Sequence, residues 1–208
     1  GLFPDVGGGW YLSRLPGRMG QFVALTGYRA SAGDCLALGL ATHFVATDQL
    51  DLVKELILKY PRDMEITLGD KCSGGDYPKI LDHSEDIDRL FASDRLEDIV
   101  AALEADGGEW AASQLAILRT KSPQSMKVSL KLLLDGKTMP TFEDEMRQEY
   151  AVASHVVQRH DFVEGVRALI VDKDNAPKWN PATAEEVSDH LIDQIFAPLP
   201  EGDAWTPA

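Results

Sequence analysis

The chain has 208 residues, of which 44% are hydrophobic, enough for one ordinary globular domain or one domain with an appendage. Its net charge of −14 disfavours nucleic acid or an anionic membrane surface as the main partner. No stretch approaches the roughly 18 uninterrupted apolar residues of a membrane span. Cys35 and Cys72 lie far apart without a zinc-site or redox spacing, which fits a reducing compartment. Composition therefore predicts a soluble, acidic, intracellular protein without a nucleic-acid or membrane partner.

The first residues have the pattern of an interior segment. An apolar Leu2-Phe3 is followed by a turn at Pro4-Asp5 and three glycines, without an initiator Met or the basic and apolar regions of a signal peptide. We therefore expect the chain to be a fragment of a longer protein.

The glycine run Gly7 to Gly9 enters an apolar helical stretch. Glycine allows a close approach of backbone to a ligand, and amides at a helix N-terminus favour negative charge. Asp5 places a carboxylate at this turn, suited to orient water, act as a base or bind a substrate hydroxyl. The alternative, favoured by the residues alone, is a tight turn with Asp5 as a helix cap. Neither GxGxxG nor GxxxxGKS/T is present, so this is not a phosphate-binding motif.

Strand signal is nearly absent from the chain. His43-Phe44-Val45 is the best candidate, and it could not form a sheet alone. Prolines, glycines and charges predict a long irregular loop over residues 61–85, with Cys72 in a possible lid or, as we prefer, a plain solvated insertion. The predicted divisions are 1–60, the end of a core with the first helices; 61–94, an irregular insertion; 95–197, a helical region; and 198–208, an extended tail.

Helical signals dominate the second half. Leu96, Ile99, Val100 and Leu103 form an amphipathic stripe that ends at Gly107-Gly108. Further helix starts are predicted at Ser122-Pro123 (through Leu134, ending near Gly136), at Thr141 (carrying Phe142, Met146, Tyr150, Ala153 and Val157), at Asp161 with Glu164, and at Thr183 with Glu186 (carrying Val187, Leu191 and Ile195).

Several blocks of sequence resemble one known family. The segment GLFPDVGGGWYLSRLPG, followed by FVALTGYRASAGDCLALGLATHFV, is similar to the crotonase (enoyl-CoA hydratase/isomerase) superfamily, in which a core element runs into a Gly-Gly turn and helix. Asp5 within FPDVGGG resembles the 3-hydroxyisobutyryl-CoA hydrolase branch, because hydratases tend to have a small residue there. The later blocks SPQSMK, RHDFVEGVRA, DKD and PKWNP agree, so the resemblance covers Gly1 to about Trp179.

The resemblance implies an acyl-CoA thioester hydrolase of valine catabolism, located in the cytoplasm, or in the mitochondrial matrix if the source is eukaryotic. It implies a mostly α, C-terminal helical part of a crotonase-like α/β fold whose spiral core lies in preceding sequence. Of the catalytic residues only Asp5 carries over, with Gly7 and Gly8 as substrate-binding, backbone-shaping neighbours. A partner glutamate, the oxyanion hole and the adenine pocket come from earlier sequence. A short-chain acyl-CoA is the substrate and no separate cofactor is expected. The net negative charge would require Lys and Arg to gather locally near such a substrate.

Other polar and aromatic residues favour structural roles. His160 beside Asp161 lacks the companions of a metal or nucleophile site. Arg159 and Arg167 suit ion pairs better than a CoA phosphate. Trp179 is predicted to pin an extended segment to a helical surface.

Two other functions remain open on the sequence. The first is an enoyl-CoA hydratase or isomerase, against which Asp5 and the Pro-Lys-Trp block argue. The second is an inactive helical module whose exposed apolar faces favour packing or homo-oligomer formation.

Overall fold

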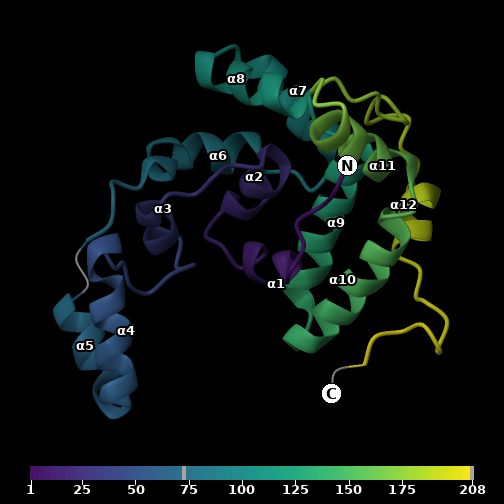
Figure 1. Cartoon of the computed structure of the whole chain (residues 1–208). Helices are drawn as coiled ribbons and strands as arrows, with labels where there is room; N and C mark the ends of the chain where they lie inside the picture. The colour runs from purple at the N-terminus through teal and green to yellow at the C-terminus, as the bar shows by residue number, and fades with distance from the viewer. Residues whose placement is uncertain (72–73, 207–208) are drawn as a thin grey trace. The chain divides into compact units, whose positions relative to one another are not determined.

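The computed structural model describes residues 1–71 and 74–206, without the side chains of residues 70 and 71. These residues form helices and contain no β-strand, which confirms the mostly α prediction (Figure 1). The strand predicted at 43–45 is wrong, because no neighbouring strand lies there to pair with it. Cys72 lies outside the described residues.

In chain order the elements are α1 (Gly8–Leu12), α2 (Met19–Thr26), α3 (Ala32–Ala37), η1 (Thr47–Gln49), α4 (Leu50–Lys59), η2 (Pro61–Asp63), α5 (Met64–Lys71), η3 (Lys79–His83), α6 (Ser84–Leu90), α7 (Leu96–Asp106), α8 (Glu109–Leu118), α9 (Pro123–Thr138), α10 (Phe142–Val156), α11 (His160–Val166), the π-helix η4 (Arg167–Val171) and α12 (Asp189–Ile195).

Two compact units make up the chain. Unit 1 consists of Gly1–Tyr28 with Glu85–Ala208, and unit 2 is Arg29–Ser84. This division differs from the four predicted segments, because residues that are distant in sequence pack into unit 1. Among the described residues no helix is long and apolar enough to cross a membrane.

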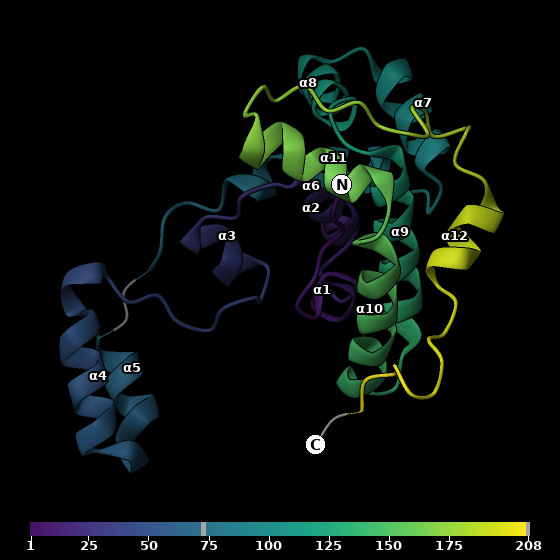
Figure 2. The same ribbon diagram turned by 45° about the vertical axis from the view of Figure 1, so that its right-hand side comes forward.

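The core of unit 1 lies between α9, α10 and α12. In Figures 1 and 2 the two long helices α9 and α10 run next to each other, with α1 against them. Burial of this apolar surface is the main stabilising contribution to the unit. The core cluster consists of Phe3, Val128, Leu132, Val152, Val156, Val187, Ile192 and Ile195.

Three predicted helix boundaries of unit 1 are confirmed. Gly107 adopts the left-handed conformation (φ 72°) at the end of α7. The Ser122 hydroxyl accepts the Ser125 N–H at the start of α9, and the Thr141 hydroxyl accepts the Asp144 N–H at the start of α10. The helix α9 ends at Thr138, close to Gly136 as predicted, although Gly136 itself lies within the helix. The absence of a side chain at Gly136 serves packing instead, since a Cβ there would lie 2.4 Å from the Gly9 carbonyl oxygen.

Two predicted helix starts are wrong. Arg159, and not Asp161, is the N-cap of α11, while the Asp161 side chain turns inward and is 1% exposed. The helix predicted to start at Thr183 begins at Asp189 with Ser188 as its cap. Glu186 does reach back to the Thr183 amide, so the capping interaction forms there without a helix following at once.

Unit 2 is built from α3 to η3. The predicted irregular insertion over 61–94 is wrong, since it contains α5, η3 and α6. Pro61 begins η2, where its missing N–H is not needed, and Ile80 and Ile87 are fully buried. The helical spacing of apolar residues is hard to recognise in this segment, because its short helices expose most of their surface and carry many charged residues.

Candidate functional site around the Asp5 turn

Asp5 precedes a backbone turn of unusual geometry. Val6 has φ 51° and Gly7 has φ 84°, so two consecutive residues adopt the left-handed region. This conformation is costly for a β-branched residue such as Val6, whose side chain is 74% exposed. Such strain persists only where surrounding structure fixes it, and it concentrates at functional sites. The turn is therefore a candidate site on geometry alone.

The Asp5 side chain is exposed and does not cap α1. The N-cap is Gly7, without a side-chain hydrogen bond, and Asp5 contributes only its backbone carbonyl, which accepts the Gly8 N–H at 3.0 Å. Among the described residues, nothing donates a hydrogen bond to the Asp5 carboxylate or pairs with it. The structural alternative of a helix cap is therefore excluded, and this carboxylate is available to solvent or a ligand.

Gly7 and Gly8 are buried, and their amides are already engaged inside the protein. The Gly7 N–H donates to Glu149 Oε2 at 2.9 Å, and the Gly8 N–H to Asp5. This favours the backbone-shaping role of the two glycines over direct donation to a substrate. That either glycine contacts substrate stays a prediction.

Two glutamates of α10 lie buried beneath the turn. Glu145 is 0% exposed and Glu149 is 5% exposed, and both belong to the face of α10 that also carries Val152 and Val156. Neither carboxylate oxygen of Glu145 has a hydrogen-bond partner of normal geometry. Gly9 makes room for this group, since a Cβ there would lie 2.5 Å from Glu145 Oε1. An acidic cluster of Asp5, Glu145 and Glu149 thus surrounds the glycine turn.

The pKa values of the two buried glutamates are raised. Burial, and after it the negative charge of the adjacent Glu149, raise the pKa of Glu145 to about 7. Burial also raises the pKa of Glu149, while the Gly7 N–H partly offsets the shift by stabilising the carboxylate. Burial, followed by the charges of Glu149 and Asp5, raises the pKa of Tyr11. The site therefore holds a proton near neutral pH, a property common among sites that perform acid–base chemistry.

Glu145 and Glu149 were not among the residues predicted from the sequence. The apolar stripe of this helix was predicted at residues such as Phe142, Tyr150 and Val157, which are 45%, 45% and 43% exposed. The buried face is rotated from that stripe. One signal was available, because both glutamates continue the helical spacing of Val152 and Val156.

Other polar residues that the sequence singled out have structural roles. Arg167 forms ion pairs with Glu164, Asp172 and Asp174. The buried Asp161 accepts the Ser122 hydroxyl and the Asn180 N–H, and so ties α9 to the C-terminal segment. Within the described ranges no group of three or more His, Cys, Asp and Glu side chains is arranged to hold a metal ion, and His160 pairs with Asp161.

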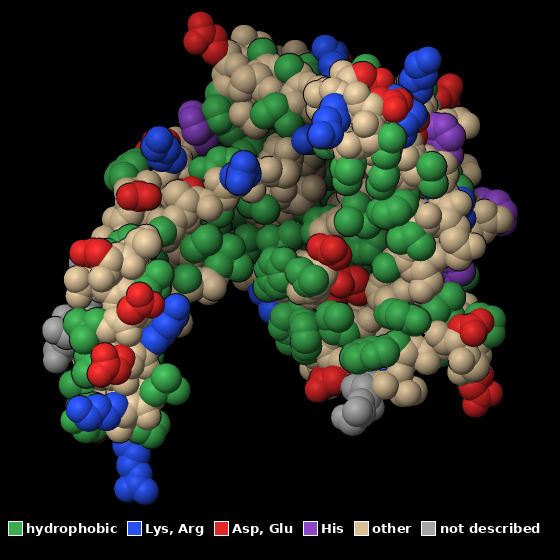
Figure 3. All heavy atoms as spheres, in the orientation of Figure 1, with side chains coloured by type: hydrophobic (Ala, Val, Ile, Leu, Met, Phe, Trp, Pro, Cys, Tyr) green, Lys and Arg blue, Asp and Glu red, His purple; other side chains and the backbone are tan. Residues whose placement is uncertain are grey.

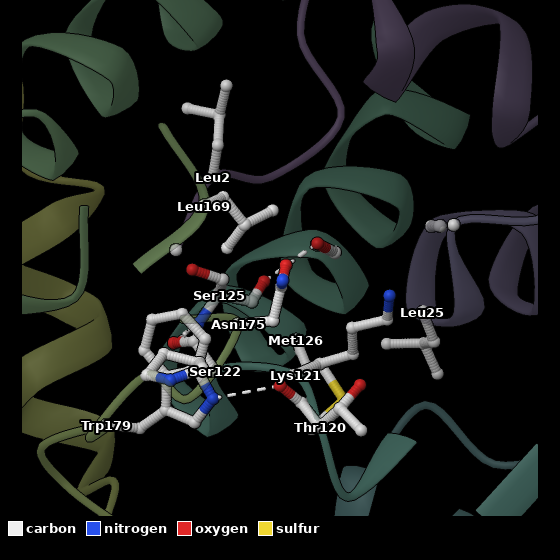
Figure 4. Close-up of a pocket in the computed structure, with 15 residues that line it drawn as sticks. Leu2, Leu25, Thr120, Lys121, Ser122, Ser125, Met126, Leu169, Asn175 and Trp179 are labelled. Carbon is white, nitrogen blue, oxygen red and sulfur yellow. Dashed lines mark hydrogen bonds between the residues drawn. The ribbon is translucent and has the colours of Figure 1, made fainter. Parts of the chain in front are cut away.

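Unit 1 also contains a cavity of about 500 Å³ near the start of the chain (Figure 4). Leu2, Leu25, Met126 and Leu169 supply apolar walls, and Lys121 is a cation at its edge. Trp179 borders the cavity and donates its indole N–H to the Thr120 carbonyl at 3.0 Å, as expected of an aromatic anchor.

Comparison with known proteins identifies the family. A sequence model described as enoyl-CoA hydratase/isomerase matches residues 1–196. The chain belongs to this family. The resemblance predicted from the sequence blocks, including that to the hydrolase branch, is confirmed by the relatives. The chain is 41% identical to 3-hydroxyisobutyryl-CoA hydrolase, mitochondrial, of Gallus gallus and 37% identical to that of Homo sapiens, over 98% of its own length.

Two solved structures of family members are similar. A carnitinyl-CoA dehydratase from Mycobacterium thermoresistibile matches with TM-score 0.88 and 33% identity, over 96% of this chain and 57% of that one. An enoyl-CoA hydratase from Rhodobacter sphaeroides matches with TM-score 0.80 and 33% identity, over 99% of this chain and 59% of that one. The chain also spans 55% of the length of the curated relatives that it matches.

Proposed function

We propose that the protein containing this chain is a CoA-thioester hydrolase that converts 3-hydroxyisobutyryl-CoA to 3-hydroxyisobutyrate and CoA. The observation that carries this proposal is the unpartnered, exposed Asp5 carboxylate on a strained glycine turn. The relatives that share the surrounding sequence are named as hydrolases of this substrate. Their names also include a mitochondrial location, which we propose for this protein if its source is eukaryotic.

In the proposed mechanism Asp5 orients the attacking water or binds the 3-hydroxyl group of the substrate. Water must be held close to the thioester carbonyl, and a carboxylate free of protein partners is suited to that task. We further propose that a second carboxylate, from outside this chain, acts as the principal base or nucleophile. The acyl-CoA is the substrate, and no further cofactor is proposed.

Replacing Asp5 with Asn in the full-length protein tests this mechanism. We expect kcat for CoA release to fall by about 100-fold or more, with KM within about 3-fold of wild type, because proton transfer and water positioning act on the chemical step. A free-thiol assay measures the release. Glu143→Gln, an exposed change on α10, is the control. Wild-type turnover by Asp5→Asn would remove Asp5 from the mechanism.

A hydratase is the second candidate, because the two similar solved structures are named as a carnitinyl-CoA dehydratase and an enoyl-CoA hydratase. An assay with an enoyl-CoA substrate separates the two functions. Loss of the enoyl absorbance without thiol release would favour hydration, and thiol release from 3-hydroxyisobutyryl-CoA would favour hydrolysis. Homo-oligomer formation stays a prediction.

A further inference from the structure

A single side chain connects the Asp5 turn to the core of unit 1. Glu149 lies on α10, 142 residues from Gly7 in sequence, and its Oε2 accepts the Gly7 N–H in a buried hydrogen bond of 2.9 Å. Gly7 is also the N-cap of α1, so this bond holds the point at which the turn becomes a helix. No apolar contact could replace it, because only an acceptor satisfies a buried amide.

The turn needs such an external constraint. Val6 and Gly7 both have positive φ, and a chain free to relax would leave this conformation at Val6. Phe142 closes the other side, since a Cβ on Gly7 would lie 2.6 Å from its ring. Glu149 and Phe142 both belong to α10, so one helix fixes the conformation of the residues that follow Asp5.

We propose that Glu149 is a positioning residue, which holds the Gly7 amide and thereby orients Asp5. This inference rests on the proposed hydrolase function. Glu149 does not touch the substrate in this scheme, and its effect on the reaction passes through the turn.

Glu145 has a separate part in the arrangement. It is fully buried one helical turn before Glu149, and like charges at that spacing repel. Arg14 does not neutralise the pair by contact, because its guanidinium stacks on Trp10 at 3.4 Å and donates to the Trp10 and Gly136 carbonyls. A proton on Glu145 removes the like charge beside Glu149, whose Oε2 accepts the Gly7 N–H.

Three variants of the full-length protein test the inference. Glu149→Met removes the acceptor with little change of volume, Glu149→Gln keeps an acceptor oxygen, and Glu143→Gln changes an exposed glutamate of the same helix. Two quantities are measured for each variant. Hydrogen–deuterium exchange of the peptide that contains Gly7 reports on the turn, and CoA release from 3-hydroxyisobutyryl-CoA gives kcat and KM.

In Glu149→Met we expect faster exchange at Gly7 and a kcat lower by about 100-fold with KM within about 3-fold, because misplacing a catalytic group by 1 Å has an effect of that size. Peptides from α9 should exchange as in wild type, which shows that the core remains folded. Glu149→Gln should keep kcat within about 5-fold of wild type, since a neutral acceptor still binds the amide. Glu143→Gln should change neither quantity.

Two results would overturn the positioning role. One is a wild-type kcat in Glu149→Met despite faster exchange at Gly7. The other is a loss in Glu149→Gln as large as that of Asp5→Asn, which would assign the effect to charge and would hold even if Glu149→Met did not fold. The two failures can be told apart. If the wild-type protein releases no CoA, the proposed function is refuted, and the catalytic consequence with it. Faster exchange at Gly7 in Glu149→Met would still show that Glu149 holds the turn.

Discussion

Two buried carboxylates, one in each unit, differ in the hydrogen-bond donors around them. In unit 2, Asp34 is 1% exposed and accepts the Ile80 N–H at 3.0 Å and the Ser31 N–H at 2.9 Å. In unit 1, Glu145 is 0% exposed, and its oxygens lack hydrogen-bond partners of normal geometry. The first carboxylate is held by backbone amides, whereas the second lies against another acid.

This difference separates a structural role from a functional one. A buried carboxylate that accepts two backbone N–H groups stabilises the fold, and Asp34 also completes a capping box with Ser31 at the start of α3. A buried carboxyl group without such donors costs stability when ionised, so its retention needs another reason. In unit 1 we propose that this reason is the turn that carries Asp5.

The largest expected effect is the pH dependence of unit 1. The pKa of Glu145 is raised from 4.5 to about 7, so the native state binds its proton more tightly than the unfolded state. The free energy of unfolding should therefore fall as pH rises from about 4.5 to about 7, by roughly 3 kcal/mol at 1.36 kcal/mol per pKa unit, and should level off above that range. The charges of Glu149 and Arg14 act on Glu145, and the charge of Asp5 acts on Glu149.

Denaturant unfolding at pH 5, 6, 7 and 8 measures this effect. Because other groups also titrate, the relevant quantity is the difference between wild type and Glu145→Gln, which should grow with pH in favour of the variant. Glu143→Gln should follow the wild-type curve, since this glutamate is exposed. Parallel curves for wild type and Glu145→Gln would show that Glu145 is ionised without cost.

A smaller effect is expected in unit 2. Asp34→Ala leaves the buried Ile80 amide and the half-buried Ser31 amide without their acceptor, at a cost of about 2 kcal/mol. Hydrogen exchange should accelerate in residues 29–84 and stay unchanged in α9. Asp63→Ala, at an exposed position of the same unit, should change neither. Equal acceleration in α9 would mean that the two units unfold together.

The smallest effect is expected at Leu58 on α4, which is 83% exposed. Figure 3 shows hydrophobic side chains interspersed with charged ones over the surface of α4 and α5. Leu58→Ala should change the free energy of unfolding by less than about 0.5 kcal/mol, because the side chain is already in water. Val53→Ala, at a buried position of the same helix, provides the contrast in the same denaturation experiment. A cost at Leu58 as large as that at Val53 would show that Leu58 is covered.

Local chemistry explains which predictions succeeded. Ser122, Thr141 and Gly107 mark helix ends through bonds or conformations that involve only nearby residues, so the sequence contains the whole signal. The cap predicted at Asp161 failed, and Gly136 lies inside α9, because both positions depend on distant residues. Asp161 is bound by Ser122 and Asn180, and Gly136 is needed where α9 approaches Gly9 closely.

The sequence by itself determined the helical content, several helix caps, the Asp5-glycine turn and the family resemblance, because each depends on residues adjacent in the chain. Only the tertiary structure decided that Asp5 is no cap, that Gly7 is held by Glu149, and that Glu145 is buried beside it. These features depend on which distant groups share a space. A carboxyl group's burial and hydrogen-bond donors set its pKa, and neither can be read from its neighbours in sequence.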